Sequence, residues 1–93
     1  MYASTKGALE AFSKNTAREW GEKGIRSNCI VSGFMETEMS ASLTADQKNR
    51  IYNRTSLKQP TNTSSVAETI AFLLSDKANS ITGQNIHVDS GTI

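Results

Sequence analysis

The first segment of the chain, from Tyr2 to about Glu22, places apolar and charged residues with the period of a helix. Apolar and small residues recur at steps of three and four, and charged residues repeat every four positions on another face. Gly21 and Gly24 then give the usual signal for a helix end. We predict a helix with a charged face and an opposite stripe for burial, which consists of Leu9, Phe12, Thr16, Ala17 and Trp20.

A run with branched residues at its ends, Ile25 to Val31, follows directly and is bounded by glycines. Its length and its flanks favour a strand. A helix that leads through a short turn into a strand is the second half of a strand-helix-strand crossover, and such crossovers build parallel sheets. The strand that would precede the helix is not in this chain.

The stretch from about Thr37 to Thr55 contains two short helical patterns, Glu38 to Leu43 and Ala45 to Arg54. Thr44 and Gln47 have the spacing of a capping box for the second pattern. Segments between a loop at the rim of a sheet and the next regular element often act as mobile lids, so we expect a lid here. Its expected anchors are Ile51 and Leu57.

A helix is also predicted after Pro60, with a cap at Asn62 or at Ser65, the latter with Glu68 three residues on. The apolar positions that follow form a broad face, which is typical of a core helix. That face consists of Val66, Ala67, Ile70, Ala71, Leu73 and Leu74.

The last predicted element is a short strand, Asn85 to Asp89. His87 should point to the sheet face opposite Ile86 and Val88. A lone histidine in this setting is more often a packed or surface residue than a ligand. No set of His, Cys, Asp and Glu has the spacing of a metal site, so we expect no metal.

Composition limits the class of protein. The 93 residues suit one small domain over residues 1–93, and 37% hydrophobic with 20% charged residues fits a globular chain. No apolar run is long enough for a membrane span and no secretory leader is visible, so we expect a cytoplasmic protein without membrane contact. Ten basic and nine acidic residues, interspersed, give no footprint for nucleic acid. The single cysteine, Cys29, should be a small buried side chain.

The chemistry that the sequence suggests begins with Tyr2 and Lys6, which lie one helical turn apart. A phenol with its ordinary pKa of about 10 is a poor acid or base near neutrality, but a nearby ammonium lowers that pKa. The pair could then act in general acid-base catalysis. The alternative is that an exposed Tyr-x-x-x-Lys pair at helical spacing does nothing chemical.

Gly33 follows the first predicted strand. In open parallel sheets, ligands bind at the carboxyl ends of the strands, so this glycine would let the main chain approach a ligand closely. The alternative is simple turn chemistry, which also favours glycine after a strand.

A series of motifs in this order resembles the carboxyl-terminal part of the short-chain dehydrogenase/reductase family, most closely its 3-oxoacyl-[acyl-carrier-protein] reductase type. The resemblance covers essentially all 93 residues. It implies an α/β, partial Rossmann-like doubly wound fold in the order helix, strand, short lid helices, helix, strand, without the amino-terminal dinucleotide-binding half. The motifs are Tyr2-x-x-x-Lys6, the strand from Gly24 to Asn28, the loop from Gly33 to Met39, the helix ending at residues 72–76, and residues 81–89.

The resemblance implies hydride transfer between a nicotinamide cofactor, NAD or NADP, and a carbonyl or alcohol carbon of a small molecule or of an acyl-carrier substrate. Tyr2 matches the catalytic acid/base. Lys6 matches the residue that hydrogen-bonds the nicotinamide ribose and lowers the tyrosine pKa.

The same resemblance implies that Gly33 and Met35 line the nicotinamide with main-chain groups and that the Thr37 hydroxyl holds the carboxamide or a phosphate. Ser32 lies in this cofactor-binding loop and is a departure, because the family commonly has proline there. Losing proline frees the local main chain.

The larger departure is that the chain has no Gly-x-x-x-Gly-x-Gly segment to receive the pyrophosphate. A sheet edge and the face of the first helix that carries Leu9, Phe12 and Trp20 should be uncovered, so we expect a homo-oligomer or a complementing amino-terminal half. Two hypotheses stay open: a reductase chain that is inactive alone, or a non-catalytic oligomerisation or interaction fragment derived from such an enzyme.

Overall fold

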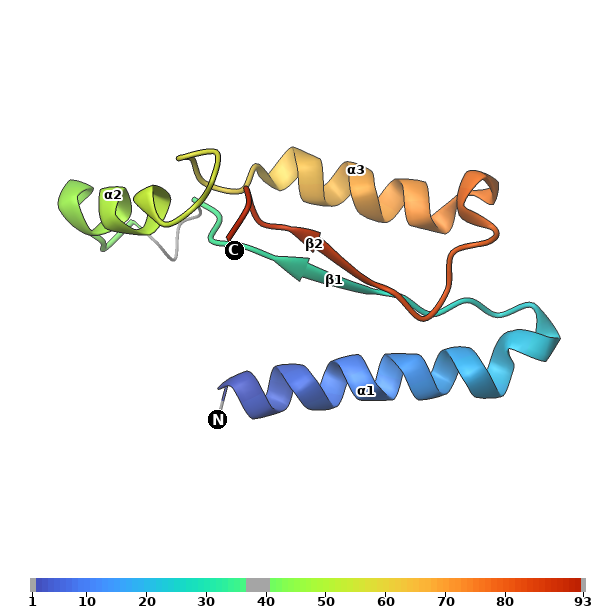
Figure 1. Cartoon of the computed structure of the whole chain (residues 1–93). Helices are drawn as coiled ribbons and strands as arrows, with labels where there is room; N and C mark the ends of the chain where they lie inside the picture. Colours follow the sequence, from blue (N-terminus) through green and yellow to red (C-terminus); the bar gives the residue numbers. More distant parts are fainter. Residues whose placement is uncertain (1, 37–40, 93) are drawn as a thin grey trace. The chain divides into compact units, whose positions relative to one another are not determined.

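The computed structural model describes the main chain of residues 2–36 and 41–92, with the side chains from Ser4 onward. Its helices are α1 (Tyr2–Trp20), α2 (Ala45–Asn53) and α3 (Thr63–Leu74), with short 3₁₀ helices η1 (Gly21–Lys23) and η3 (Asp76–Ala78) (Figure 1). Strands β1 (Cys29–Ser32) and β2 (Asn85–Val88) pair in parallel as a two-stranded sheet. The predicted α/β class is confirmed.

The chain divides into two compact units, which are described separately. The first unit contains residues 1–30 and 71–86, and the second contains residues 31–70 and 87–93. The prediction of one domain over residues 1–93 stays a prediction.

Helix α1 ends close to the position that the two glycines predicted for its end. After Trp20 the chain tightens into η1, and Gly24 takes a left-handed conformation with φ of 76°. The Gly24 N–H donates to the Gly21 carbonyl at 3.0 Å, and the Ile25 N–H donates to the Trp20 carbonyl at 3.2 Å. These bonds satisfy carbonyls that the helix end would otherwise leave unpaired.

Strand β1 begins at Cys29 rather than at the predicted Ile25. The polar groups of the residues before it form hydrogen bonds with the segment from Ser75 to Gln84 and do not extend the strand pairing. The Arg26 guanidinium donates to the carbonyls of Ser75 and Ile81, and the Asn28 side chain bonds the Ile81 carbonyl and the Gln84 N–H. In Figure 1 residues 25–30 run beside residues 81–86 within the first unit.

The buried part of the first unit is small. Ala17, Leu73 and Ala78 are buried, and Ser13 is buried with its hydroxyl 2.9 Å from that of Ser27. Of the stripe predicted for burial, Leu9 and Phe12 are 62% and 69% exposed, which agrees with the expected uncovered face. Cys29, predicted to be buried, is half-buried.

In the second unit, α2 begins with the predicted capping box. The Thr44 hydroxyl accepts from the Gln47 N–H at 3.1 Å, and the Gln47 side chain accepts from the Thr44 N–H at 2.9 Å. Ile51 is half-buried, but Leu57 is 63% exposed, so the prediction of Leu57 as an anchor is wrong. Of the helix predicted over Glu38 to Leu43, residues 38–40 lie outside the described residues and residues 41–43 form a turn.

Helix α3 uses the first of its two predicted caps. The Asn62 carboxamide oxygen accepts from the Ser64 N–H at 2.8 Å. Ser65 lies inside the helix, so the alternative cap there is wrong. Leu73 is buried, whereas Ile70 and Leu74 are exposed, so the face predicted for the core is largely open. In β2 His87 is exposed whereas Ile86 and Val88 are half-buried, which agrees with the predicted alternation.

Candidate functional site

Tyr2 is the first residue of α1, and Lys6 lies one turn further along the continuous helix. The side chain of Tyr2 is outside the described side chains, and Lys6 is half-buried. The first turn of α1 contains no acidic residue. Among the described residues, Lys6 forms no ion pair within 4.0 Å, so its ammonium is not neutralised by a carboxylate of this part of the chain.

Ser32, Gly33 and Met35 lie together where β1 runs into the loop that follows it. Ser32 is the exposed last residue of β1, and the Gly33 N–H donates to the Val88 carbonyl at 3.0 Å. These residues belong to the second unit, whereas Tyr2 and Lys6 belong to the first. Thr37, the remaining predicted cofactor contact, lies outside the described residues.

The pairing of Met35 with Thr61 determines which way the main-chain N–H and carbonyl of Met35 face. Met35 and Thr61 form a parallel bridge, in which the Thr61 N–H donates to the Phe34 carbonyl at 2.8 Å. In a parallel bridge of this register, the residues on either side of Met35 carry the hydrogen bonds, so the N–H and carbonyl of Met35 face away from Thr61. Thr61 is therefore not the hydrogen-bond partner of these two groups.

Gly33 is a glycine for a reason that the sequence did not reveal. Its φ is not in the left-handed region, so turn chemistry does not require it. A Cβ built on Gly33 would lie 2.6 Å from Thr61 Oγ1, 2.8 Å from Asp89 Cα and 2.9 Å from Asp89 Cβ. Such distances are far below van der Waals contact, so the missing side chain leaves room for Thr61 and Asp89.

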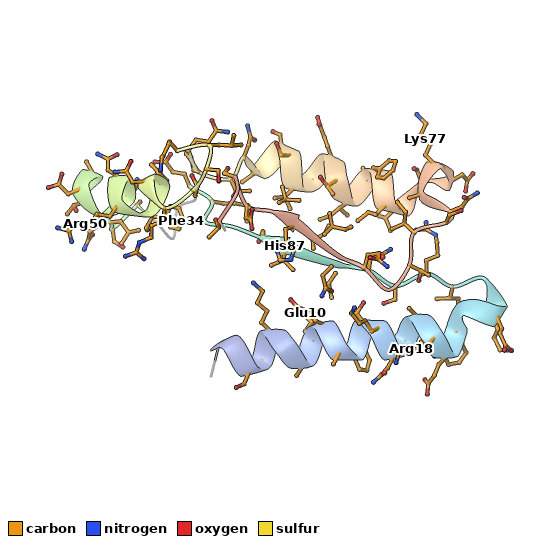
Figure 2. The ribbon with its side chains drawn as sticks, viewed as in Figure 1. Glu10, Arg18, Phe34, Arg50, Lys77 and His87 are labelled. Carbon is orange, nitrogen blue, oxygen red and sulfur yellow. The ribbon has the colours of Figure 1, made fainter. Side chains whose placement is uncertain are left out.

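Two contacts join this loop to α2. The centroids of the Phe34 and Tyr52 rings lie 6.1 Å apart, and the ring planes make an angle of 52°. Figure 2 shows Phe34 beside α2. Lys48 Nζ donates to Glu36 Oε1 at 2.9 Å. This hydrogen bond raises the pKa of Lys48 above its ordinary value of 10.5, because the carboxylate favours the charged ammonium.

A cavity of about 330 Å³ adjoins the loop at Glu36 and is lined otherwise by residues 59–63. Thr61 contributes to it, although its Oγ1 is buried and has no hydrogen-bond partner in the described structure. Sequence reasoning did not identify Gln59 or Thr61, which line this cavity. The polar run around the Asn62 cap was the one signal in this region.

Two further findings concern metal sites and membrane-spanning helices. Within residues 2–36 and 41–92, no three His, Cys, Asp or Glu side chains are grouped so as to hold a metal ion. None of the described helices is both long enough and apolar enough to cross a membrane.

Comparison with known proteins gives consistent matches. The family model described as enoyl-(acyl carrier protein) reductase matches residues 1–92. The chain is 39% identical over 90 residues to the 3-oxoacyl-[acyl-carrier-protein] reductase FabG of Staphylococcus epidermidis, covering 97% of this chain and 37% of that protein. The FabG of Escherichia coli K12 gives the same identity and coverage.

Among solved structures, a 4-hydroxyisoleucine dehydrogenase complexed with NADH superposes with a TM-score of 0.92 at 31% identity. The match covers 98% of this chain and 38% of that protein. The chain therefore spans well under half the length of the proteins that it resembles.

Proposed function

The chain belongs to the short-chain dehydrogenase/reductase family, and from this premise we propose that it carries the acid-base pair and part of the nicotinamide pocket of an oxidoreductase. The reaction is reduction of a carbonyl, or oxidation of the corresponding alcohol. The names of the FabG relatives favour a carbonyl on an acyl-carrier substrate. The observation that carries the proposal is α1, which keeps Tyr2 and Lys6 one turn apart on a single helix.

One feature of the described residues fits a nicotinamide. The N–H and carbonyl of Met35 face away from Thr61, which suits main-chain bonds to a carboxamide. Met35 would hold the carboxamide with these groups, Thr37 would add its hydroxyl, and Lys6 would hold the ribose. Ser32 and Gly33 would set the path of the loop. A bound NAD or NADP supplies or accepts the hydride.

The roles of the chain's own residues follow from their chemistry. The Tyr2 hydroxyl gives its proton to the carbonyl oxygen as the carbon is reduced, and it takes the proton back in the oxidation direction. The Lys6 ammonium, one turn away, stabilises the phenolate and so lowers the pKa of Tyr2 toward neutrality. Proton and hydride together convert a carbonyl into an alcohol.

The 93 residues contain no glycine-rich pyrophosphate segment, and we propose that turnover needs such a segment, whether from the same polypeptide or from another chain. The test joins the chain to the amino-terminal part of the S. epidermidis FabG. Replacing Tyr2 with Phe should lower kcat by at least about a hundredfold with little change in cofactor KM. Tyr52→Phe, which removes the other phenol, is the matched control and should keep activity. Unchanged turnover in Tyr2→Phe would contradict the role.

A second function is favoured by a separate observation. Leu9 and Phe12 expose 62% and 69% of their surface on adjacent turns of α1. Such an apolar face is typical of an interaction surface. In this alternative the chain serves as an oligomerisation or interaction module and Tyr2 does no chemistry. An active chimera that loses activity in Tyr2→Phe would exclude it.

A further inference from the structure

The loop Gly33–Glu36 lies between two supports within the second unit. On one side is the end of β2, where the Gly33 N–H bonds the Val88 carbonyl and Asp89 fills the space beside the glycine. On the other side is Thr61, which bridges Met35 and bonds the Phe34 carbonyl. Both supports contact the loop directly, so a shift of either one moves its main chain.

The first support is fixed by one carboxylate. Asp89 Oδ1 accepts from the Gly91 N–H at 2.9 Å and from the Thr92 N–H at 3.2 Å, and 17% of the side chain is exposed. The Asp89 carbonyl also accepts from the Thr92 hydroxyl at 2.9 Å. Asp89 Oδ2 faces His87 Nδ1 at 3.7 Å, beyond ordinary hydrogen-bond length.

The turn that follows Asp89 is conformationally costly. Ser90 has φ of 57° and Gly91 has φ of 79°, both in the left-handed region. That region is strained for a residue with a Cβ, such as Ser90. Charge-assisted bonds from N–H groups to a carboxylate are stronger than bonds between neutral groups, so Asp89 offsets this cost.

The same turn reaches the second support. The N–H groups of Ser56 and Leu57 donate to the carbonyls of Gly91 and Ser90 at 2.9 and 3.0 Å. The Ser90 hydroxyl donates to the Pro60 carbonyl at 3.3 Å, one residue before Thr61. One turn therefore ties the end of β2 to the segment that holds the opposite side of the loop.

We propose that Asp89 is a positioning residue for the loop Gly33–Glu36, because its carboxylate holds the turn that links both supports and so sets where the Met35 main chain lies. This inference rests on the proposed function, in which Met35 lines the nicotinamide. Asp89 touches no reacting group and acts only through the turn.

The first test uses the full chain and measures amide hydrogen exchange. Asp89→Ala should speed exchange of the Gly33 and Thr61 N–H groups by about tenfold, because it removes two hydrogen bonds from the turn. Asp89→Asn keeps an acceptor oxygen but loses the charge, so it should speed exchange less than Asp89→Ala does. Asp76→Ala, at an exposed acid in η3, is the matched control and should change neither amide.

A milder variant keeps the test decisive if Asp89→Ala does not fold. Ser90→Ala removes only the bond to Pro60, so it should speed exchange at Thr61 and leave Gly33 unchanged. Exchange at Thr61 that stays at the parental rate in Ser90→Ala would overturn the link between the supports. Equal losses in Asp89→Asn and Asp89→Ala would show that the acceptor oxygen is not the cause.

The second test uses the chimera with the amino-terminal part of the S. epidermidis FabG. Asp89→Ala should raise the KM for the nicotinamide cofactor about tenfold, with kcat at saturating cofactor changed less than about twofold, and Asp89→Asn should raise the KM less than Asp89→Ala does. Faster exchange without a change in KM would overturn the role of the loop in cofactor binding. Unchanged exchange would overturn the positioning role of Asp89 and leave the assignment of Tyr2 and Lys6 intact.

Discussion

Thr61 occupies the space that a side chain at Gly33 would need, with its Oγ1 2.6 Å from the Cβ position. These residues are far apart in the sequence but adjacent in the second unit, where Thr61 also pairs with Met35. The glycine thus permits close approach of two chain segments, and the loop after β1 follows a path that a larger residue would change.

Gly33→Ala should destabilise the chain by about 1–3 kcal/mol, because the added methyl group overlaps Thr61 and Asp89. Gly7→Ala is the matched control. Apart from the main chain of its own helix, no atom of the described residues lies within 4 Å of its Cβ position, and alanine in a helix should gain roughly 0.5–1 kcal/mol. Urea unfolding monitored by circular dichroism compares the two. Equal midpoints would contradict the packing role of Gly33.

Asn28→Ala should cost about 1–3 kcal/mol, because it removes the partner of the Gln84 N–H and one donor to the Ile81 carbonyl. Asn28→Asp keeps the acceptor for Gln84 and should lose less. Thermal unfolding measures the difference, with Asn53→Ala at an exposed position of α2 as the control. A midpoint of Asn28→Ala equal to that of the control would contradict a stabilising role for the hydrogen bonds of Asn28 to residues 81–84.

The Lys48–Glu36 bond should stabilise α2 against the loop in a pH-dependent way. The pKa of Lys48 is raised in the folded chain, so its contribution is fully present below the ordinary pKa of 10.5 and is lost as pH rises through the folded pKa. Carbon-13 NMR titration of the Lys48 side chain measures its pKa in the folded chain. Glu36→Gln should bring the pKa back toward its ordinary value; an unchanged titration in Glu36→Gln would mean that the carboxylate is not the cause.

Phe12→Ser should weaken self-association by on the order of tenfold, because a buried phenylalanine contributes about 1.5–3 kcal/mol. Leu57→Ser, at a residue 63% exposed in the second unit, is the control and should change association little. Light scattering at micromolar concentration gives the mass of each variant. A parent chain that stays monomeric throughout would remove the basis of the oligomerisation hypothesis.

Local pattern predicted the elements well. The period of apolar residues gave α1, α2 and α3, the Thr44–Gln47 spacing gave a capping box that is present, and glycine placed the end of α1. Each depends on residues a few positions apart, so the sequence contains the whole cause. The start of β1 was predicted too early, because Arg26 and Asn28 bond residues 75 to 84, which lie far along the chain.

The sequence by itself therefore determined the helices, the Thr44–Gln47 capping box and the Tyr2–Lys6 spacing, since these depend on neighbouring residues, and the order of motifs along the chain indicated the family. Only the tertiary structure decided why position 33 is glycine, which way the main chain of Met35 faces and that Asp89 supports both sides of one loop. Those properties arise where distant segments meet, and steric exclusion and hydrogen-bond direction between them cannot be read from either segment alone.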